Sequence, residues 1–535
     1  MPPPPRTPIL IIGAGPVGLS LGLELLHHNI PVHILEKTPE ITEHHPKGRN
    51  NDMRSLEHYR RWGISDELRS LSWKTANPNQ ELVVKERLID DSPTGRFPLK
   101  YGRDPEESRE LVAEPSLSVP QPVLMGVLER RVVELGGNVW RGWEVTEVSD
   151  RGETVLVTAR QDGKTVQVEA DLVRKKMGVE QEGVGPIGRS WSYVVRSEGY
   201  PIANAIKGCE YDALGFLVIV NDDATAILSI PGPDEWGFVK LVRGKENDGP
   251  PPDEDAAALA RTLLGAPAKI NITSRASFAV MTRLSKEYRR GRLFIAGDAC
   301  HLCPPTGGHN MNTGIDDVVN LGWKLAAVVQ GWGGESLLDT YHTERWPVAK
   351  RVLDVAMGNM IAMNEGVKPA IDPELPRPTA AENAQDLFDR TYSMWHSYGL
   401  VLDQRYDGSP VIVNEGWDDA PDWNPITCWP HARPGHRAPH MWLMDGTPLY
   451  DGFGKEFTLL SAGASEDAVE RFFSAAKKLG LPLARLDIDP DTARSKYQAS
   501  LTLIRPDQYI SWQGDDCAAE LILRQVTGWG QGNTS

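Results

Sequence analysis

A short unit near the N-terminus constrains the fold of this chain more than any other segment. Residues 9–12 are apolar, the glycine-rich run 13–18 follows at once, and an apolar stretch over 19–26 leads to a second one that ends at Glu36. A strand, a glycine-rich turn, a helix and a strand ending in an acidic residue, all within about 30 residues, form a dinucleotide-binding βαβ unit. We therefore expect the chain to begin with a parallel sheet covered by helices.

Each glycine of this unit has its own physical role. Gly13 permits the tight turn, Gly15 lets a pyrophosphate approach the backbone, and Gly18 lets the helix pack on the strand. Glu36 is expected to hold the two ribose hydroxyls. The alternative, a purely structural turn, is disfavoured because strand, turn, helix and acid occur together. The cofactor-binding residues predicted here are Gly13, Gly15, Pro16, Val17, Gly18, Glu36 and Lys37.

A second glycine-rich segment lies almost 300 residues later. An apolar strand over 293–296 stops at Gly297, the loop 304–308 has the sequence Pro-Pro-Thr-Gly-Gly, and an amphipathic helix follows. Glycines let backbone N–H groups approach a planar ligand, and the positive end of the helix dipole favours negative charge, such as a reduced flavin develops. Two distant segments fit FAD better than NAD, because an extended FAD needs contacts at both ends.

These segments give the sequence its resemblance to a known family. It resembles the class A flavoprotein monooxygenases, the FAD-dependent aromatic hydroxylases related to p-hydroxybenzoate hydroxylase and phenol hydroxylase. The matching blocks cover much of the first 350 residues, at 13–36, 54–57 with 61–64, 120–128, 291–325 and 338–345. The block that contains Gly297 and Asp298 is the most specific, because its residues recur in order over more than thirty positions.

The C-terminal part resembles the thioredoxin-like appendage of phenol and polyketide hydroxylases. The matching residues lie at 437–440, 445–460 and 505–512. Residues 431–535 contain no Cys-x-x-Cys, and their one cysteine is Cys517, so this segment cannot perform dithiol exchange by itself. We expect it to have a structural role or to contact another subunit.

The resemblance implies an α/β fold with three parts. These are a Rossmann-like FAD-binding domain, an inserted antiparallel-sheet substrate domain, and a C-terminal thioredoxin-like domain. The expected bounds are 1–189 for the first part of the FAD domain, with a substrate-side excursion at about 80–114, 190–282 for the sheet, 283–366 for the second part of the FAD domain, 367–430 for a linker, and 431–535 for the last domain.

The resemblance also implies an activity in which the cofactor performs the difficult chemistry. NADPH or NADH would reduce FAD, O2 would add to give a C4a-hydroperoxyflavin, and a phenolic or polyketide-type aromatic substrate would be hydroxylated. Asp298 is expected to bind the ribityl chain, Gln121 and Arg54 to lie near the phosphates, and 305–312 to line the flavin. No catalytic side chain is assigned. The further predicted cofactor-binding residues are Arg54, Gln121, Gly297, Asp298, Pro305, Gly307, Gly308, His309, Asn310, Met311 and Asn312.

Several other residues have simpler interpretations. His301 is expected to be a structural histidine with satisfied hydrogen bonds rather than a base. Cys300 and Cys303 have metal-like spacing, but they lie inside the segment 297–309 that is expected to approach the flavin, called the flavin loop below. They also have no second cysteine pair, so no metal site is predicted. The aromatic residues Tyr193, Tyr200 and Trp236 are candidates to line the substrate pocket.

The chain departs from the family pattern after residue 173. Residues 169–173 match a strand, and 174–179 match the helix that follows a Gly-x-Asp-Gly-x-x-Ser turn, but the turn itself is absent, so the strand is expected to run straight into the helix. One explanation is an in-frame deletion, for instance from a mispredicted splice site. The other is a natural variant that has lost normal nicotinamide handling.

The composition of the chain disfavours some classes of binding partner. The formal net charge of −16 opposes binding to nucleic acid, and no apolar run approaches the roughly 18 residues of a membrane span. Five cysteines in 535 residues suit a reducing compartment, so a cytoplasmic protein is expected, with a homodimer as a candidate assembly. Two alternatives to hydroxylation stay open: the same scaffold could perform epoxidation, Baeyer-Villiger insertion or dehydrogenation, or it could be an impaired, non-catalytic flavin-binding descendant.

Overall fold

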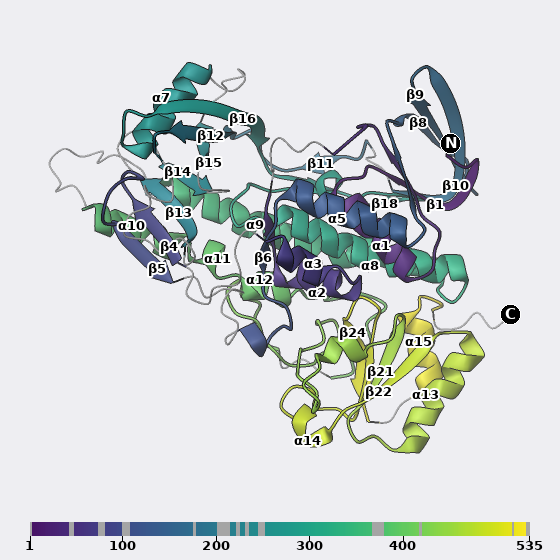
Figure 1. Cartoon of the computed structure of the whole chain (residues 1–535). Helices are drawn as coiled ribbons and strands as arrows, with labels where there is room; N and C mark the ends of the chain where they lie inside the picture. The colour runs from purple at the N-terminus through teal and green to yellow at the C-terminus, as the bar shows by residue number, and fades with distance from the viewer. Residues whose placement is uncertain are drawn as a thin grey trace.

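The computed structural model contains three units that meet around a central bundle of helices (Figure 1). A parallel sheet with its helices occupies the middle, a second sheet with its own helix lies at the upper left, and the C-terminal unit lies below. The structure describes residues 3–41, 48–72, 81–98, 108–174, 178–200, 214–220, 225–229, 235–243, 252–365, 379–416, 420–515 and 518–530.

The central sheet is built around parallel strands in the order β19-β10-β1-β2-β7. These strands are β1 (Arg6–Ile12), β2 (His33–Glu36), β7 (Asn138–Arg141), β10 (Lys164–Arg174) and β19 (Leu293–Phe294). Antiparallel pairing adds β18 (Arg289–Arg290) at one edge, and extends the first half of β10 with β9 (Val155–Gln161) and β8 (Glu144–Asp150). The predicted dinucleotide-binding sheet is therefore present.

Helices bury their apolar residues against this sheet and against one another. They include α1 (Pro16–His27), α2 (Met53–Arg61), α3 (Ser65–Ser70), α5 (Gln121–Glu134), α8 (Asn310–Gln330) and α9 (Thr340–Glu365). Two glycines let α1 approach its neighbours closely. A Cβ at Gly22 would lie 3.0 Å from Ile34, and one at Gly322 on α8 would lie 2.5 Å from Glu24. This packing places the start of α8 beside the start of α1.

The second sheet has the order β16-β12-β15-β14-β13-β4-β5. Its strands are β4 (Glu81–Lys85), β5 (Gly95–Pro98), β12 (Gly188–Glu198), β13 (Leu214–Val220), β14 (Thr225–Ser229), β15 (Glu235–Arg243) and β16 (Lys269–Val280). The strands β12 to β16 pair with one another antiparallel, as expected, and β4 is added to them by a parallel pairing with β13. The segment before residue 100 therefore completes a sheet whose other strands come from 188–280.

Helices cover the two faces of this sheet unequally. Helix α7 (Asp253–Leu264) buries its alanines and leucines against one face. The helices α10 (Ala380–Arg390) and α11 (Tyr392–Trp395) cover the opposite face near β4, β5 and β13, where Phe97 stacks on Phe388 with ring centroids 4.4 Å apart. The opposite face near β12 and β16 retains partly exposed side chains.

The C-terminal unit has the mixed sheet of a thioredoxin-like fold. Its strand order is β22-β21-β23-β24, with β21 parallel to β22 and the other pairs antiparallel. The elements are β21 (Phe457–Ser461), α13 (Glu466–Leu479), β22 (Leu483–Asp487), α14 (Pro490–Ala493), β23 (Leu501–Ile504), β24 (Ile510–Gly514) and α15 (Ala519–Val526). Cys517 lies outside the described residues. Helix α12 (Tyr398–Leu402) precedes this unit along the chain.

Short strands connect the units near the flavin loop. One small sheet pairs β3 (Asn50–Asn51) with β6 (Leu117–Ser118), and another has the order β11-β17-β20. The latter strands are β11 (Gln181–Glu182), β17 (Arg283–Ser285) and β20 (His301–Leu302). Through β17 and β20, the end of the second sheet reaches the segment that follows Gly297.

The predicted helix over 174–179 is not formed as expected. Arg174 is the last residue of β10 and pairs with Ile11 and Phe294 in the sheet, while Gly178 and Val179 lie outside any helix. The intervening residues 175–177 lie outside the described part of the chain. On the two sides of this gap, Arg174 pairs in the central sheet and Gln181 pairs with Ser285.

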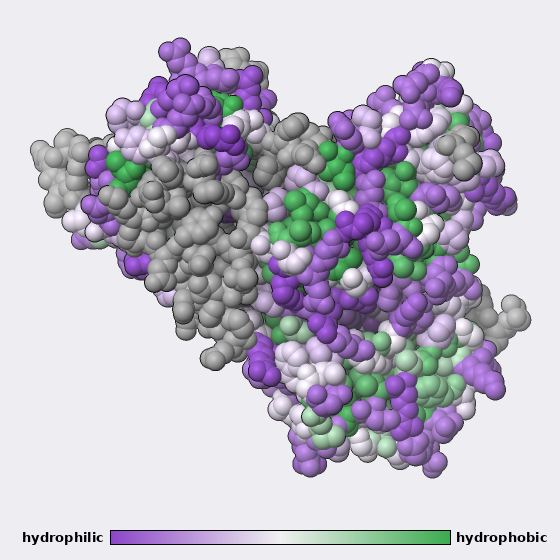
Figure 2. All heavy atoms as spheres, viewed as in Figure 1, coloured by the Kyte–Doolittle hydropathy of each residue, from purple (hydrophilic) through white to green (hydrophobic). Residues whose placement is uncertain are grey.

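The surface agrees with the acidic, polar composition. In the view of Figure 2, hydrophilic residues predominate, and hydrophobic ones form small scattered groups. Among the described residues, none of the helices combines the length and the apolar character that spanning a bilayer requires.

Candidate functional site

The two glycine-rich segments meet at one edge of the central sheet. Gly13 follows β1, Glu36 ends β2, and Gly297 follows β19, so all three lie at the carboxyl ends of parallel strands. Val17 connects the segments: a Cβ on Gly297 would lie 2.8 Å from its side chain, and one on Gly314 would lie 2.7 Å away. Ligands of open α/β sheets bind at such an edge.

The first glycine turn has a closed side and an open side. Gly13 has φ of 102°, and its N–H donates to the Leu35 carbonyl oxygen at 2.8 Å. A Cβ on Gly18 would lie 1.9 Å from the Gly13 oxygen, so only glycine fits there. A Cβ on Gly15 would have no described heavy atom within 4 Å. The space beside Gly15 lies at the start of α1, where backbone N–H groups point outward.

Glu36 is held at the rim of the same turn. Its carboxylate accepts hydrogen bonds from the Ala14 N–H at 2.8 Å and from the backbone and hydroxyl of Thr38 at 2.8 and 2.9 Å. Partial burial would raise the Glu36 pKa, but these donors outweigh it and lower the pKa. Glu36 is therefore an oriented, ionised acceptor, while the neighbouring Lys37 is exposed.

A chain of polar contacts leads from the second segment into the core. Asp298 is exposed and accepts a hydrogen bond from the Asn310 amide at 2.7 Å. The Asn310 oxygen lies 3.1 Å from His301 Nδ1, and His301 Nε2 lies 2.8 Å from Asp317. Asp317 in turn accepts from the buried Arg345 at 2.9 Å. Both ring nitrogens of His301 are thus engaged, which supports its interpretation as a structural histidine.

Asp317 is a residue that the sequence interpretation missed. Its second carboxylate oxygen also accepts the Gly297 N–H at 3.1 Å, so one buried side chain holds the strand end and His301 together. The positive charges of His301 and Arg345 lower the Asp317 pKa although burial would raise it. Nothing local in the sequence marks this residue, because its partners lie 16, 20 and 28 positions away.

The loop before α8 is a tight, glycine-dependent turn. The Gly308 N–H donates to the Pro305 oxygen at 3.1 Å, and both Gly307 and Gly308 have positive φ, at 85° and 66°. Asn312 fixes this turn: its amide donates to the Gly308 and Asn50 oxygens at 3.0 and 3.1 Å. The Asn312 side chain is therefore engaged by protein, which leaves backbone groups of the turn and of the helix start for a ligand.

His309 and Met311 also lie at the start of α8. Within the described residues, no side chain caps this helix, whose N-cap is His309. His309 is buried, its Nε2 has no hydrogen-bond partner in the described structure, and burial lowers its pKa to about 4. A neutral, unpartnered imidazole at a glycine turn suits a site that a ligand completes.

The two residues predicted to lie near the FAD phosphates, Gln121 and Arg54, have different surroundings. Gln121 begins α5, and its N–H donates to the Gly48 oxygen at 2.9 Å, so it lies beside the segment that leads to β3. Among the described residues, the hydrogen bonds of the Arg54 side chain lead away from the glycine turns. Its guanidinium contacts Glu57 at 2.7 Å, the Asp507 oxygen at 2.7 Å and the Gln508 side chain. Arg54 thus faces the C-terminal unit.

The aromatic candidates for the substrate pocket lie on the face of the second sheet that α7 covers. Tyr193 and Trp236 are almost fully buried in the core beneath α7, and Tyr200 packs against the same core. Side chains alternate across a strand, and the pattern alone does not say which face is which. On the opposite face, residues that pair across neighbouring strands form one row of side chains. This row contains Val84, Val218, Ile227, Val239, Ser192 and Ala276.

One end of this row differs from the other. Val84 and Val218 are buried under α10 and α11, whereas Val239, Ser192 and Ala276 remain partly exposed. The sequence interpretation missed these three residues because small and β-branched residues carry no chemical signature.

The two cysteines of the flavin loop, Cys300 and Cys303, differ in burial. Cys300 is buried, and Cys303 has its pKa raised to about 12 by burial and by the nearby Asp298. Across the described ranges, no three His, Cys, Asp or Glu residues gather in a way that could hold a metal ion.

The site and the fold together define a flavoprotein with two nucleotide-binding segments and a thioredoxin-like C-terminal unit. Residues 6–356 match a family model described as an FAD binding domain, and residues 431–529 match one described as the C-terminal domain of aromatic-ring hydroxylases. The chain belongs to the family of FAD-dependent monooxygenases that carry these two domains.

Relatives and solved structures agree over the whole length. The FAD-dependent monooxygenase apdD of Emericella nidulans is 31% identical over 97% of this chain and 90% of its own. The 4-methyl-5-nitrocatechol 5-monooxygenase of a Burkholderia species is 28% identical over 97% and 96%. The rebeccamycin biosynthetic enzyme RebC, solved with reduced flavin, superposes with a TM-score of 0.84 at 26% identity and covers 99% of this chain and 100% of its own.

Proposed function

We propose that this chain hydroxylates a phenolic or polyketide-type aromatic ring, using bound FAD, O2, and NADPH or NADH as the electron donor. The observation that carries the proposal is the contact of Val17 with Gly297 and Gly314, which joins two glycine-rich segments at one sheet edge. Family membership and the aromatic substrate in the name of one relative support the same reaction class.

The residues at this edge fit FAD. The open space beside Gly15 at the start of α1 suits the pyrophosphate, and the ionised Glu36 suits the ribose hydroxyls. Asp298, exposed and already oriented by Asn310, suits the ribityl chain. The Pro305–Gly308 turn and the α8 start would line the flavin ring with backbone groups. When bound, FAD supplies the oxygen activation and electron transfer that no side chain can perform.

The protein's own task is to position the substrate and to exclude water. Among the described side chains, the partly exposed end of the row at Val239, Ser192 and Ala276 offers an apolar surface with one hydroxyl. A flat aromatic ring could lie against such a surface, and the hydroxyl could orient a phenol oxygen. We also propose that NADPH or NADH donates the electrons, that the protein is cytoplasmic, and that two copies of the chain form a homodimer.

A direct experiment follows the oxygen atom. The purified chain is incubated with added FAD, NADPH or NADH and a panel of phenols under ¹⁸O2, and products are measured by mass spectrometry. The proposal predicts substrate-stimulated oxidation of one nicotinamide and incorporation of a single ¹⁸O atom into a ring hydroxyl. Nicotinamide oxidation without any labelled product across the panel would count against hydroxylation.

A second candidate function, flavin binding without catalysis, is suggested by the connection that follows strand β10. It ends at Arg174 and β11 begins at Gln181, so a short connection replaces the turn that the family pattern carries at the centre of this edge. An impaired flavin-binding protein would follow if that turn is needed for the reaction. Tight FAD binding with no substrate-stimulated turnover in the same experiment would favour this candidate.

A further inference from the structure

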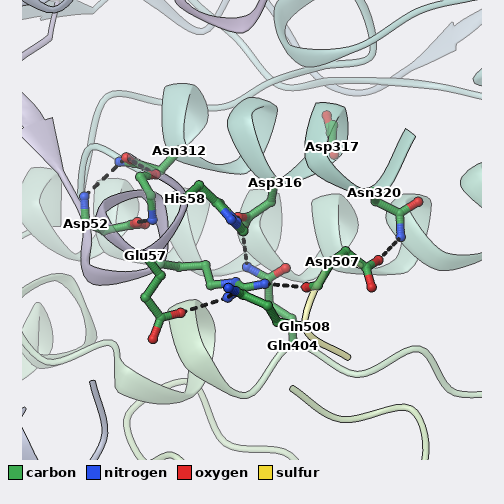
Figure 3. A network of polar contacts seen from close by, with 12 residues as sticks. Asp52, Glu57, His58, Asn312, Asp316, Asp317, Asn320, Gln404, Asp507 and Gln508 are labelled. Atoms are coloured by element: carbon green, nitrogen blue, oxygen red, sulfur yellow. Dashed lines mark hydrogen bonds and ion pairs between the residues drawn. The ribbon is translucent and has the colours of Figure 1, made fainter. Parts of the chain in front are cut away.

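One turn of the C-terminal unit inserts into the helices that carry the flavin loop. We define the docking turn as residues 505–509, between β23 and β24. Arg505 is buried and donates to both carboxylate oxygens of Glu344 on α9 at 2.7 and 2.8 Å. Asn320 on α8 donates to the Asp507 carboxylate at 3.2 Å. The docking turn therefore bonds to α8 and α9 at buried positions, and Figure 3 shows the contact of Asp507 with Asn320 on α8.

The same turn also holds the helix α2. Arg54 donates to the Asp507 oxygen at 2.7 Å and to the Gln508 side chain, and Arg61 donates to the Pro506 oxygen at 2.6 Å. Gln508 has φ of 68°, a conformation that few residues other than glycine adopt. A residue with this backbone conformation, whose buried side chain meets a buried arginine, indicates a position held by its surroundings.

The N-terminal end of α2, to which Arg54 belongs, also reaches the flavin loop. Asp52 caps this helix by accepting the Ser55 N–H at 2.9 Å. The Asn312 oxygen accepts from the Asp52 N–H at 3.2 Å and from the Ser55 hydroxyl at 2.9 Å, while its amide donates to the Gly308 oxygen at 3.0 Å. Figure 3 shows Asp52, Asn312, Asp507 and Gln508 around this one group of helices.

A third contact fixes α2 between its ends. His58, in the middle of the helix, lies 3.2 Å from Asp316 on α8, and Asp316 accepts from Gln404 at 2.7 Å. Helix α2 thus has fixed partners along its length. Arg54 lies between Asp52 and Ser55, so a shift of Arg54 passes directly to the two residues that contact Asn312, because the backbone of this helical turn is rigid.

We propose that the docking turn is a positioning element of the cofactor site: the C-terminal unit holds α2 and, through Asn312, keeps the Gly307-Gly308 turn in the shape that the flavin ring requires. This inference rests on the proposed function, since it assumes that the turn lines the flavin. It assigns the thioredoxin-like unit a role that needs no dithiol. The acting residue is Gln508, through Arg54, rather than any group that touches the reacting atoms.

The test replaces Gln508 in the full-length chain. Gln508→Asn keeps a residue that tolerates positive φ but shortens the side chain away from Arg54, and Gln508→Gly keeps the backbone shape without any side chain. Gln508→Glu keeps a side chain of the same length with an oxygen that accepts from Arg54. Arg485→Ala, which removes an exposed ion pair with Glu466 in the same unit, is the matched control.

Two readouts are measured for each variant. FAD affinity is measured by flavin fluorescence, and hydrogen exchange of residues 304–316 is measured in the flavin-free protein. We expect Gln508→Asn and Gln508→Gly to weaken FAD binding at least about fivefold, a typical coupling between sites, and to speed exchange in 304–316. Gln508→Glu and Arg485→Ala should behave like the unmodified chain.

The outcomes separate this inference from the proposed function. Unchanged FAD affinity and unchanged exchange in both the Asn and Gly variants would overturn the inference, as would a lower melting temperature with neither readout altered. If the unmodified chain binds no FAD, the proposed function fails, and exchange in 304–316 still decides whether the docking turn positions the loop.

Discussion

Gly15 and Gly18 stand three residues apart in one motif, yet their surroundings differ completely. The position of a Cβ on Gly15 is open, whereas one on Gly18 would lie 1.9 Å from the Gly13 oxygen. Gly15 also has an extended backbone, with φ of −75°, which alanine adopts easily. One glycine therefore serves the ligand, and the other serves the packing of helix on strand.

Alanine substitutions should separate these two roles. Gly15→Ala is expected to leave the melting temperature unchanged and to weaken FAD binding about tenfold or more, because a methyl group fills the pyrophosphate space. Gly18→Ala should destabilise the protein by about 1 to 3 kcal/mol through overpacking. Thermal unfolding and FAD titration of both variants check this; equal losses of stability would contradict it.

Asp298 should matter for cofactor affinity and not for folding. It is exposed, and its carboxylate accepts a hydrogen bond from the amide of Asn310. Asp298→Ala removes the proposed acceptor of the ribityl hydroxyls and should cost about 1 to 3 kcal/mol of FAD binding. The exposed Asp491→Ala is the control. FAD affinity that is the same in both variants would refute the role.

At the scale of elements, the end of β10 is the position that we expect to affect cofactor placement most. Val173 and Arg174 pair with both β1 and β19, so β10 ends between the two strands that lead into the glycine segments. Lengthening the connection after this strand should therefore act on the middle of the cofactor site, where a misplacement near 1 Å can cost about a hundredfold in rate.

Purification without added flavin tests this element. The chain as it stands should carry less than one FAD per molecule and oxidise NADPH or NADH slowly even with a phenol present. A Gly-x-Asp-Gly-x-x-Ser turn inserted between Val173 and Arg174 should raise both FAD content and rate. Full FAD occupancy and rapid, substrate-stimulated oxidation by the unmodified chain would show that another segment has taken over the role.

Elements with local signals were predictable, and those decided by distant partners were not. The turn 13–18 and the segment around Gly297 were readable because their glycines follow apolar strands. The face on which Tyr193 lies was not, because alternation gives two faces without saying which one α7 covers. The contact of Arg54 with Gln508 was not predictable, because the two residues lie 454 positions apart. The parallel pairing of β4 with β13 was equally invisible.

At the scale of the whole molecule, buried charge joins the C-terminal unit to the FAD domain. His28 on α1 lies 3.2 Å from Glu24 and 3.0 Å from Glu456 of the C-terminal unit. Burial alone would lower the His28 pKa, but hydrogen bonds to the two glutamates raise it to about 9. The protonated imidazole thus bridges two parts of the molecule.

This bridge should make stability depend on pH. Because the folded pKa lies above the unfolded value near 6.5, the stabilisation is complete below pH 6.5 and is lost as pH rises towards 9. Its magnitude is about 3 kcal/mol. The melting temperature of the unmodified chain should fall between pH 6.5 and 9 more steeply than that of His28→Gln. Parallel curves for the two proteins would contradict the bridge.

Titration of the flavin-free chain with FAD tests the central claim, that one FAD spans both glycine segments. The account predicts a single class of site that saturates at one FAD per chain and is weakened by Gly15→Ala and by Asp298→Ala, each without loss of folding. Saturation at a different ratio, or FAD affinity that neither substitution changes, would contradict it.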